Sequence, residues 1–335
     1  MENVLNALPL TIEDIKKAYE IVSKEARKTP LVKSFYLTAV SKGEIYLKLE
    51  NMQLTGSFKF RGGYNKVYSL TKAERAKGVI ACSAGNHAQG VALASRLLGV
   101  KATIVMPQTA PQAKVNATKG YGAEVVLFGD TFDEAKAKCL EIMEQTGQTF
   151  LDPFNDIQVM AGQGTIGIEI LEDLWDVDTI ISPIGGGGMI SGIAVAVKSF
   201  NPNIKIIGVQ AENVHGMKAS YDKGEITQHY QAPTLADGCA VQVPGNMTFE
   251  ITKNLIDDII TVSEHELEVA MKDLMQRGKA IVEGAGALPT AALLAGKVKQ
   301  YVEGKKVVAI VSGGNVDLKR VSDICEHFIG VEAVK

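Results

Sequence analysis

Short apolar runs rich in β-branched residues alternate with helical stretches through most of the 335-residue chain. Helical periodicity is clear in residues 131–145 and 263–277, which lie between such runs. Strands that alternate with helices pair in parallel, and strands with few polar positions belong to sheets covered on both faces. The chain is therefore predicted to have an α/β fold built on parallel sheets. The runs predicted as strands are residues 44–50, 79–83, 102–106, 124–128, 179–184, 204–210 and 306–312.

The length of the chain favours two domains or one large α/β unit, because a single hydrophobic core rarely extends beyond about 250–300 residues. Residues 52–153 contain a compact strand–helix series that can form a small open sheet of its own. Residues 1–51 and 154–335 are predicted to form a larger sheet together. The sequence contains no internal repeat and no low-complexity linker between the two parts.

Four consecutive glycines, residues 185–188, follow the apolar run TIISPI and open the helical run MISGIAVAV. A strand, a glycine loop and a helix in this order aim free backbone N–H groups and the positive end of a helix dipole at an anion. Glycine also lets the backbone approach a phosphate with no Cβ in the way. The alternative is a flexible turn. Because the loop lacks the Gly-Lys-Ser/Thr ending of a Walker A loop, a nucleoside triphosphate is not favoured.

Residues 162–167, GQGTIG, match the G-x-G-x-x-G pattern of dinucleotide-binding proteins. That pattern works between a strand and a helix, with an acidic residue at the end of the next strand. Here the preceding DIQVMA is predicted as helix, and the next strand ends in Ser182-Pro183. The match is therefore interpreted as accidental. Because no other feature supports a nicotinamide dehydrogenase, that function is not favoured.

Lys59 lies between Phe58 and Phe60 in the segment SFKFRGG, at the predicted start of a helix. A lone lysine is usually a solvated surface residue. Apolar surroundings, however, disfavour the charged ammonium and lower the lysine pKa from about 10.4. A lysine amine with a lowered pKa is what Schiff-base chemistry requires. Lys59 is therefore predicted to be catalytic.

Two further loops follow predicted strands and indicate ligand binding. SAGNH, residues 83–87, lies between the strand VIACS and a helix, so it can form a second anion site suited to a carboxylate, to which Asn86 adds a neutral donor. An ordinary helix cap is the alternative. SGGN, residues 312–315, lies at the carboxyl end of the strand VVAIVS, where open α/β sheets place ligand groups.

The charge and the cysteines argue against several classes of protein. A net charge of −3 and a pI near 6.0 argue against binding of nucleic acid. The longest apolar runs fall short of the roughly 20 residues that span a membrane, and the N-terminus lacks the features of a signal peptide. The four cysteines are scattered without metal-ligand spacing, so no metal site is predicted. We expect a cytoplasmic protein with reduced thiols.

The segments SFKFRG, SAGNHAQG, GGGG and SGGN together resemble the fold-type II pyridoxal-phosphate enzymes, whose fold is like that of tryptophan synthase β. ENMQLTGSFKFRG, AGQGTIGIEI, GVQAENVHGM, LADGC and EGAGAL follow in the expected order between Thr11 and Phe328, so the chain is similar to the catabolic, or short, threonine dehydratases. The resemblance implies two open twisted parallel-sheet domains with pyridoxal 5'-phosphate between them. Because the chain stops at Lys335, we expect no C-terminal regulatory domain of the kind that the biosynthetic threonine deaminases carry.

The resemblance also implies roles for individual residues. Lys59 would bind the cofactor covalently and Ser312 would face its pyridine nitrogen, and these two are the expected catalytic residues. The glycines at 185–188 would hold the phosphate, and Asn86 would hydrogen-bond the ring hydroxyl. The expected cofactor-binding residues are Phe58, Lys59, Asn86, Gly185, Gly186, Gly187, Gly188, Met189, Gly238, Glu283 and Ser312. The residues expected at the substrate carboxylate are Ser83, Ala84, Gly85, Asn86 and His87.

The reaction that the resemblance implies is a β-elimination. It would convert L-threonine to 2-oxobutanoate and ammonia, and also L-serine to pyruvate and ammonia. Enzymes of this kind assemble as homo-oligomers, dimers or tetramers, and are often activated by AMP. A pocket near Thr55, Gln89 and Asn315 is predicted for that effector.

Two alternatives share the scaffold. Serine racemases carry a serine at the position of Ala84, and an alanine cannot exchange a proton, so the sequence favours a dehydratase. A non-catalytic amino-acid-binding relative would have lost the lysine, and Lys59 is present.

Overall fold

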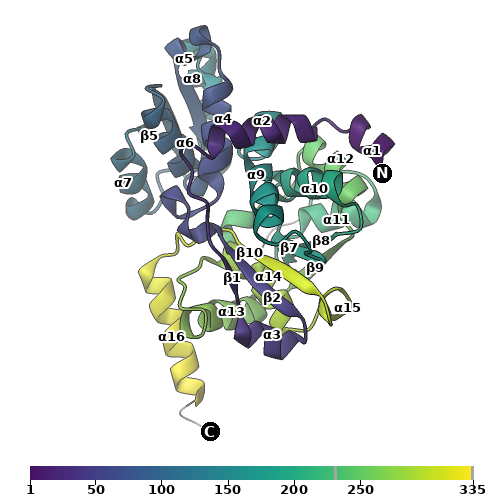
Figure 1. The fold of residues 1–335 in the computed structure, drawn as a ribbon. Helices are drawn as coiled ribbons and strands as arrows, with labels where there is room; N and C mark the ends of the chain where they lie inside the picture. The colour runs from purple at the N-terminus through teal and green to yellow at the C-terminus, as the bar shows by residue number, and fades with distance from the viewer. Residues whose placement is uncertain (230–231, 333–335) are drawn as a thin grey trace.

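Two open β-sheets form the framework of the protein, in a computed structural model that describes residues 1–229 and 232–332 (Figure 1). The larger sheet has the strand order β1-β2-β10-β7-β8-β9, with β1 (Leu31–Lys33), β2 (Glu44–Leu49), β7 (Thr179–Pro183), β8 (Lys205–Ala211), β9 (Asp258–Val262) and β10 (Lys306–Val311). The smaller sheet has the order β5-β4-β3-β6, with β3 (Val79–Cys82), β4 (Ala102–Met106), β5 (Glu124–Leu127) and β6 (Thr149–Phe150).

Helices form most of the connections between the strands. In Figure 1 the helices α4 to α8 surround the smaller sheet in the upper lobe, and α16, in yellow, extends below the larger sheet. The α-helices are α1 (Glu2–Ala7), α2 (Ile12–Val22), α3 (Phe35–Ser41), α4 (Lys59–Ser69), α5 (Lys72–Lys77), α6 (Asn86–Leu97), α7 (Gln112–Gly120), α8 (Phe132–Thr146), α9 (Ile157–Asp173), α10 (Gly188–Phe200), α11 (Gly216–Lys223), α12 (Asn246–Leu255), α13 (Glu264–Gln276), α14 (Gly284–Leu294), α15 (Lys299–Val302) and α16 (Leu318–Glu332). Three 3-10 helices are η1 (Glu50–Met52), η2 (Leu54–Gly56) and η3 (Asp237–Cys239).

The strand pairs of the described residues are parallel, apart from β1 with β2. Strand β10 lies inside the larger sheet, with Val307 opposite Ile45 of β2 on one side and Thr179 of β7 on the other. The predicted α/β fold with parallel sheets is confirmed. The sequence does not predict β1, β6 or β9. Strands β1 and β6 are three and two residues long, too short to show a period.

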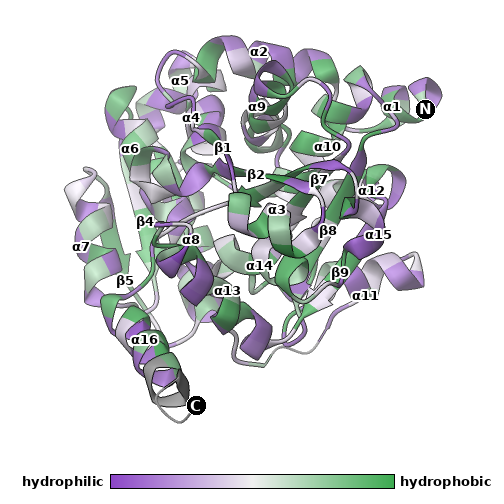
Figure 2. Ribbon diagram, turned by 60° about the horizontal axis from the view of Figure 1, so that its bottom comes forward, coloured by the Kyte–Doolittle hydropathy of each residue, from purple (hydrophilic) through white to green (hydrophobic). Residues whose placement is uncertain are grey.

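Alternate residues of the larger sheet pack on its opposite faces. Ile181 and Val307 belong to a core formed with α13 and α14, whereas Ile180 and Val308 belong to a core formed with α2, α9 and α10. In Figure 2 hydrophobic colour predominates in the strands of the larger sheet, and the helices that surround them carry both hydrophilic and hydrophobic residues. Because both faces are covered, the central strands β7 and β10 are mostly apolar and do not alternate between apolar and polar residues.

A cluster of buried charges joins α4 to the larger sheet. The Arg61 guanidinium donates from Nε to Glu50 Oε2 at 2.8 Å and from Nη1 to Glu169 Oε1 at 2.6 Å. Lys48 Nζ donates to Glu169 Oε2 at 2.6 Å, and all four side chains are buried. Lys48 lies in β2, Glu169 in α9 and Arg61 in α4. The cluster therefore fixes the helix that begins at Lys59 against both elements.

The strands divide between the two parts of the chain that the sequence predicts as domains. Each strand of the smaller sheet lies within residues 52–153, and each strand of the larger sheet lies outside them. We therefore propose residues 52–153 as a small domain and residues 1–51 with 154–335 as a large one. In the part of the chain that the structure describes, no helix is both long enough and apolar enough to cross a bilayer.

Candidate active site

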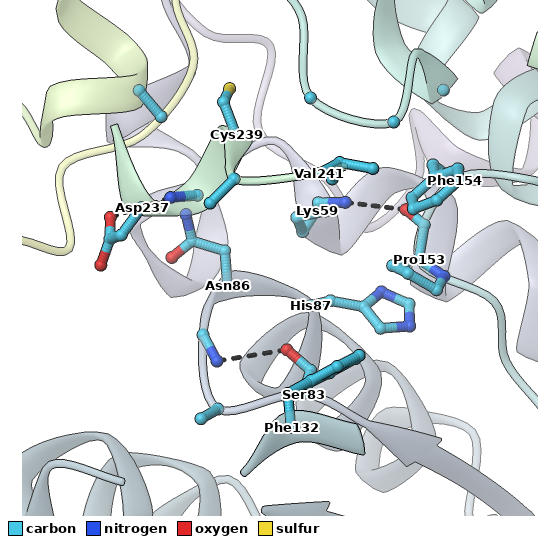
Figure 3. Close-up of a pocket in the computed structure, with 18 of the residues that line it drawn as sticks. Lys59, Ser83, Asn86, His87, Phe132, Pro153, Phe154, Asp237, Cys239 and Val241 are labelled. Carbon is cyan, nitrogen blue, oxygen red and sulfur yellow. Dashed lines mark hydrogen bonds between the residues drawn. The ribbon is translucent and has the colours of Figure 1, made fainter. Parts of the chain in front are cut away.

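A cavity of about 730 Å³ opens at the carboxyl ends of strands from both sheets. Ser83 follows β3, Gly185 lies just beyond β7, and Ser312 follows β10. Open α/β sheets bind ligands at this edge. Figure 3 shows Lys59, Ser83, Asn86 and His87 in this cavity. Each residue predicted for the cofactor or the substrate carboxylate lines it: Phe58, Lys59, Ser83, Ala84, Gly85, Asn86, His87, Gly185, Gly186, Gly187, Gly188, Met189, Gly238, Glu283 and Ser312.

Lys59 occupies the first turn of α4, and its amine points into the cavity (Figure 3). Nζ donates a hydrogen bond to the Pro153 carbonyl oxygen at 2.7 Å and lies 5.3 Å from the centre of the Phe58 ring. Burial disfavours the ammonium form and lowers the pKa of Lys59 from 10.5 to about 8. Phe60 is instead buried in the core of the smaller sheet. The amine thus has the lowered pKa that the sequence predicts, with one phenylalanine beside it instead of two.

The glycine loop, residues 185–188, leads from β7 into α10. Gly187 has a φ of +94°, a conformation that residues with a Cβ rarely adopt. A Cβ at Gly186 would lie 2.3 Å from the ring of Phe154, and Thr248 Oγ1 donates to the Gly186 carbonyl oxygen at 2.6 Å. The first N–H groups of a helix have no intrahelical acceptor, so those of α10 are available to an anion in the cavity.

The other glycine pattern, residues 162–167, lies inside α9. A Cβ at Gly162 would lie 2.7 Å from the Cα of Gly62 in α4, and a Cβ at Gly164 would lie 2.9 Å from the Gly192 carbonyl oxygen in α10. These glycines let helices approach one another closely. The interpretation of the pattern as accidental is therefore confirmed.

The loop of residues 83–87 connects β3 with α6. The Gly85 N–H donates to Ser83 Oγ at 3.2 Å, and His87 Nε2 donates to the Leu151 carbonyl oxygen at 2.9 Å. Burial lowers the pKa of His87 to about 3, so the imidazole is neutral. Its single N–H group already donates to the Leu151 carbonyl oxygen. His87 therefore anchors the loop, and a negative ligand would be bound by backbone N–H groups instead of an imidazolium.

Asn86 and Glu283 meet on one wall of the cavity. Asn86 Nδ2 donates to Glu283 Oε1 at 2.7 Å. Burial, together with the charge of the neighbouring Asp237, raises the pKa of Glu283 to about 7. An asparagine amide has two N–H groups, so Asn86 keeps a second donor beside the one that Glu283 uses.

The sequence prediction misses Pro153 and Phe154, which contact Lys59 and the glycine loop. Both follow β6, so they stand at the same sheet edge as the other site residues, but a two-residue strand gives no pattern to reveal that edge. Cys239 in η3 is also missed, and it lines the cavity. Burial raises the pKa of Cys239 to about 12, so its thiol stays protonated.

A second cavity of about 560 Å³ lies beside the first, and Asp237 and Glu283 line both. Two of the residues predicted for an effector, Gln89 and Asn315, line this second cavity. The third, Thr55, is not among its lining residues, and its carbonyl oxygen accepts a hydrogen bond from Asn315 Nδ2 at 2.7 Å.

A family model described as pyridoxal-phosphate dependent enzyme matches residues 22–313, which is more than half of the chain. The chain belongs to this family. The family membership predicted from the sequence is confirmed, and with it the cofactor, pyridoxal phosphate.

Individual relatives of this pyridoxal-phosphate enzyme include both dehydratases and racemases. The catabolic L-threonine dehydratase TdcB of Staphylococcus aureus strain N315 is 59% identical over 324 residues, which cover 96% of this chain and 94% of that protein. The processed form of threonine deaminase isoform 2 from Solanum lycopersicum has a TM-score of 0.89 at 39% identity and matches 94% of this chain and 91% of its own. Maize serine racemase has a TM-score of 0.91 at 34% identity and matches 97% of this chain and 99% of its own. The fold by itself therefore does not separate the two activities.

The cavity of this pyridoxal-phosphate enzyme fits its cofactor in three places. Lys59 presents a buried amine with a lowered pKa for a covalent link. The glycine loop and the start of α10 present N–H groups for the phosphate. Asn86 keeps a donor for the ring hydroxyl. Separate elements bring these three kinds of group to one cavity. The residues that line it therefore match the chemistry of pyridoxal phosphate.

Proposed function

We propose that this enzyme converts L-threonine to 2-oxobutanoate and ammonia, and L-serine to pyruvate and ammonia. It is then a threonine ammonia-lyase, a carbon–oxygen lyase. The observation that carries the proposal is the cavity around Lys59, where a pyridoxal-phosphate site adjoins a loop that has an alanine at position 84. The relative named L-threonine dehydratase, at 59% identity, supports threonine as a substrate.

The cofactor, when bound, supplies a conjugated ring that delocalises negative charge from the substrate Cα. The Lys59 amine, with a pKa of about 8, is partly unprotonated near neutral pH and acts as the base that takes the Cα proton. The N–H groups of residues 83–87 hold the substrate carboxylate and so orient the Cα–H bond toward that amine. Removal of the Cα proton and the β-hydroxyl is loss of water, and addition of water to the product releases ammonia and the 2-oxo acid.

We assign Ser312 to the pyridine nitrogen of the cofactor. Ser312 is buried at the carboxyl end of β10. A neutral serine does not keep that nitrogen protonated as an aspartate would, so negative charge at Cα is short-lived and elimination is favoured. Phe58, Met189 and Gly238 line the same cavity and are proposed to enclose the ring.

A serine racemase is the second candidate, because a racemase is among the similar structures. Racemisation needs a proton donor on the face of the substrate opposite Lys59. Ala84 lines the cavity and carries neither a hydroxyl nor an ionisable group, which favours the dehydratase.

The products of the wild type and of Ala84→Ser test this choice. The wild type is expected to form pyruvate from L-serine and 2-oxobutanoate from L-threonine, with no detectable D-serine. Ala84→Ser is expected to form measurable D-serine, at a rate roughly 10²-fold above the wild-type background, which is the lower end of the effect of a placed acid or base, and to slow elimination. Oxo-acid assays and chiral chromatography of long incubations measure both products.

Ala137→Ser, on the exposed surface of α8, is the matched control and is expected to form no D-serine. Substantial D-serine from the wild type would show that the opposite-face donor lies elsewhere, and the racemase would then replace the dehydratase.

We further propose a homodimer or homotetramer that AMP activates, in the cytoplasm, where its free cysteines stay reduced. Support for the nucleotide comes from the second cavity. Gln89 and Asn315 line it together with the basic side chains of Lys114, Lys319 and Arg320, which suit a phosphate.

Turnover of threonine is expected to follow a sigmoidal curve that AMP makes hyperbolic. AMP binds the active state more tightly than the inactive one, so it should lower the half-saturating threonine concentration by roughly 5- to 150-fold. Initial rates with and without AMP measure the shift, and adenosine, which lacks the phosphate, serves as the control. A hyperbolic curve that AMP leaves unchanged would remove the effector while the dehydratase stands.

A further inference from the structure

A strained turn directly precedes the segment that carries Lys59. Thr55 has a φ of +65° and a ψ of +9°, and Gly56 has a φ of +73°. The left-handed conformation is rare for a β-branched residue, whose Cβ meets the neighbouring carbonyl oxygen. Asparagine tolerates it through local hydrogen bonds, but the Thr55 hydroxyl is buried and has no hydrogen-bond partner among the described residues. The rest of the structure must therefore hold the turn.

Asn315 and its neighbour Gly314 hold this turn. Asn315 Nδ2 donates to the Thr55 carbonyl oxygen at 2.7 Å, and the Gly314 N–H donates to the Gly56 carbonyl oxygen at 2.9 Å. A Cβ at Gly56 would lie 2.7 Å from Asn315 Oδ1, so the two segments are in close contact. The backbone just before Lys59 thus follows the position of Asn315.

The same amide sets the orientation of Asn86. Asn315 Nδ2 also donates to Asn86 Oδ1 at 2.8 Å, and Asn86 Nδ2 donates to Glu283 Oε1 at 2.7 Å. An amide nitrogen can only donate, so Asn86 must turn its oxygen toward Asn315 and its NH₂ group toward Glu283. A reversed Asn86 amide would bring two NH₂ groups together. The N–H that Asn86 keeps for the cofactor ring therefore depends on Asn315.

We propose that Asn315 is a positioning residue for catalysis, independent of any nucleotide. Its one amide holds the strained turn before Lys59 and fixes the donor of Asn86. Asn315 is also three residues from Ser312, so it links three parts of the site that are far apart in sequence. The inference rests on the proposed function only for the measurement of kcat. The absorption titration and the hydrogen exchange test it without that function.

The test uses Asn315→Ala and Asn315→Asp without nucleotide. Asn315→Asp keeps the shape of the side chain, but it places a carboxylate oxygen, which cannot donate, against the Thr55 carbonyl oxygen and Asn86 Oδ1. Both variants are expected to lower kcat by about 10²-fold, the effect of a misplacement of about 1 Å. They should also shift the pH titration of the visible absorption of the bound cofactor, and speed amide hydrogen exchange of residues 54–60 in the apoenzyme. Asn254→Asp, the same change on the exposed face of α12, should alter none of the three.

Thr55→Gly separates positioning from general damage. Glycine relieves the left-handed strain, so in the Asn315→Ala background it should restore kcat by roughly tenfold and slow the exchange again. Normal kcat, titration and exchange in Asn315→Ala would overturn the proposal, and so would a loss of kcat with the titration and the exchange both unchanged. A wild type without dehydratase activity would refute the proposed function instead, and the exchange and the absorption would still decide the role of Asn315.

Discussion

Enzyme in which alanine replaces Lys59 is expected to lose threonine dehydration, with kcat reduced by about 10⁴-fold or more, because it loses its general base and its covalent hold on the cofactor. The amine is held at the cavity by the first turn of α4 and by the Pro153 carbonyl oxygen. The protein should also lose the visible absorption of the lysine-bound cofactor. Oxo-acid formation and the absorption spectrum measure the two losses.

Lys72→Ala provides the control, because this lysine lies on the exposed surface of α5, outside the cavity lining. It should keep the activity and the spectrum of the wild type. Normal turnover by Lys59→Ala would mean that another group is the base, and the assignment of the site would be wrong.

Replacing Arg61 with methionine is expected to lower the free energy of unfolding by about 3–5 kcal/mol, since it breaks a buried ion-pair cluster from one side. Burial raises the pKa of Glu50, but Arg61 beside it outweighs burial and holds that pKa below its usual value. Without Arg61, Glu50 and Glu169 share only the charge of Lys48. Urea unfolding of the apoenzyme, followed by far-UV circular dichroism, measures the loss.

Arg277→Met is the matched control, because Arg277 also pairs with a carboxylate, Asp273, but has an exposed side chain. Exposed pairs contribute about 0–1 kcal/mol, so this variant should unfold near the wild-type urea concentration. Equal stability of the two variants would show that the buried cluster does not hold α4 in place.

Local sequence determined the elements and much of the chemistry. The strands β3, β4 and β7 are buried along their whole length, and their mostly apolar residues indicate this without any knowledge of the fold. The glycine loop is recognisable because a strand precedes it and a helix follows it, both within a few residues. The same local context also shows that residues 162–167 lie in a helix, where a dinucleotide loop cannot form. These features depend on neighbours in the chain, so the chain alone reveals them.

Tertiary structure alone decided which distant groups meet. Arginine is mostly an exposed residue type, yet Arg61 is fully buried because carboxylates from two other elements surround it. Pro153 reaches the Lys59 amine only because β6 pairs with β3, and that strand has too few residues to be recognised. Asn315, predicted beside an effector, also donates to Thr55 and Asn86, which are 260 and 229 residues away along the chain. Burial and hydrogen-bond partners depend on how elements pack, and no local pattern of residues encodes that packing.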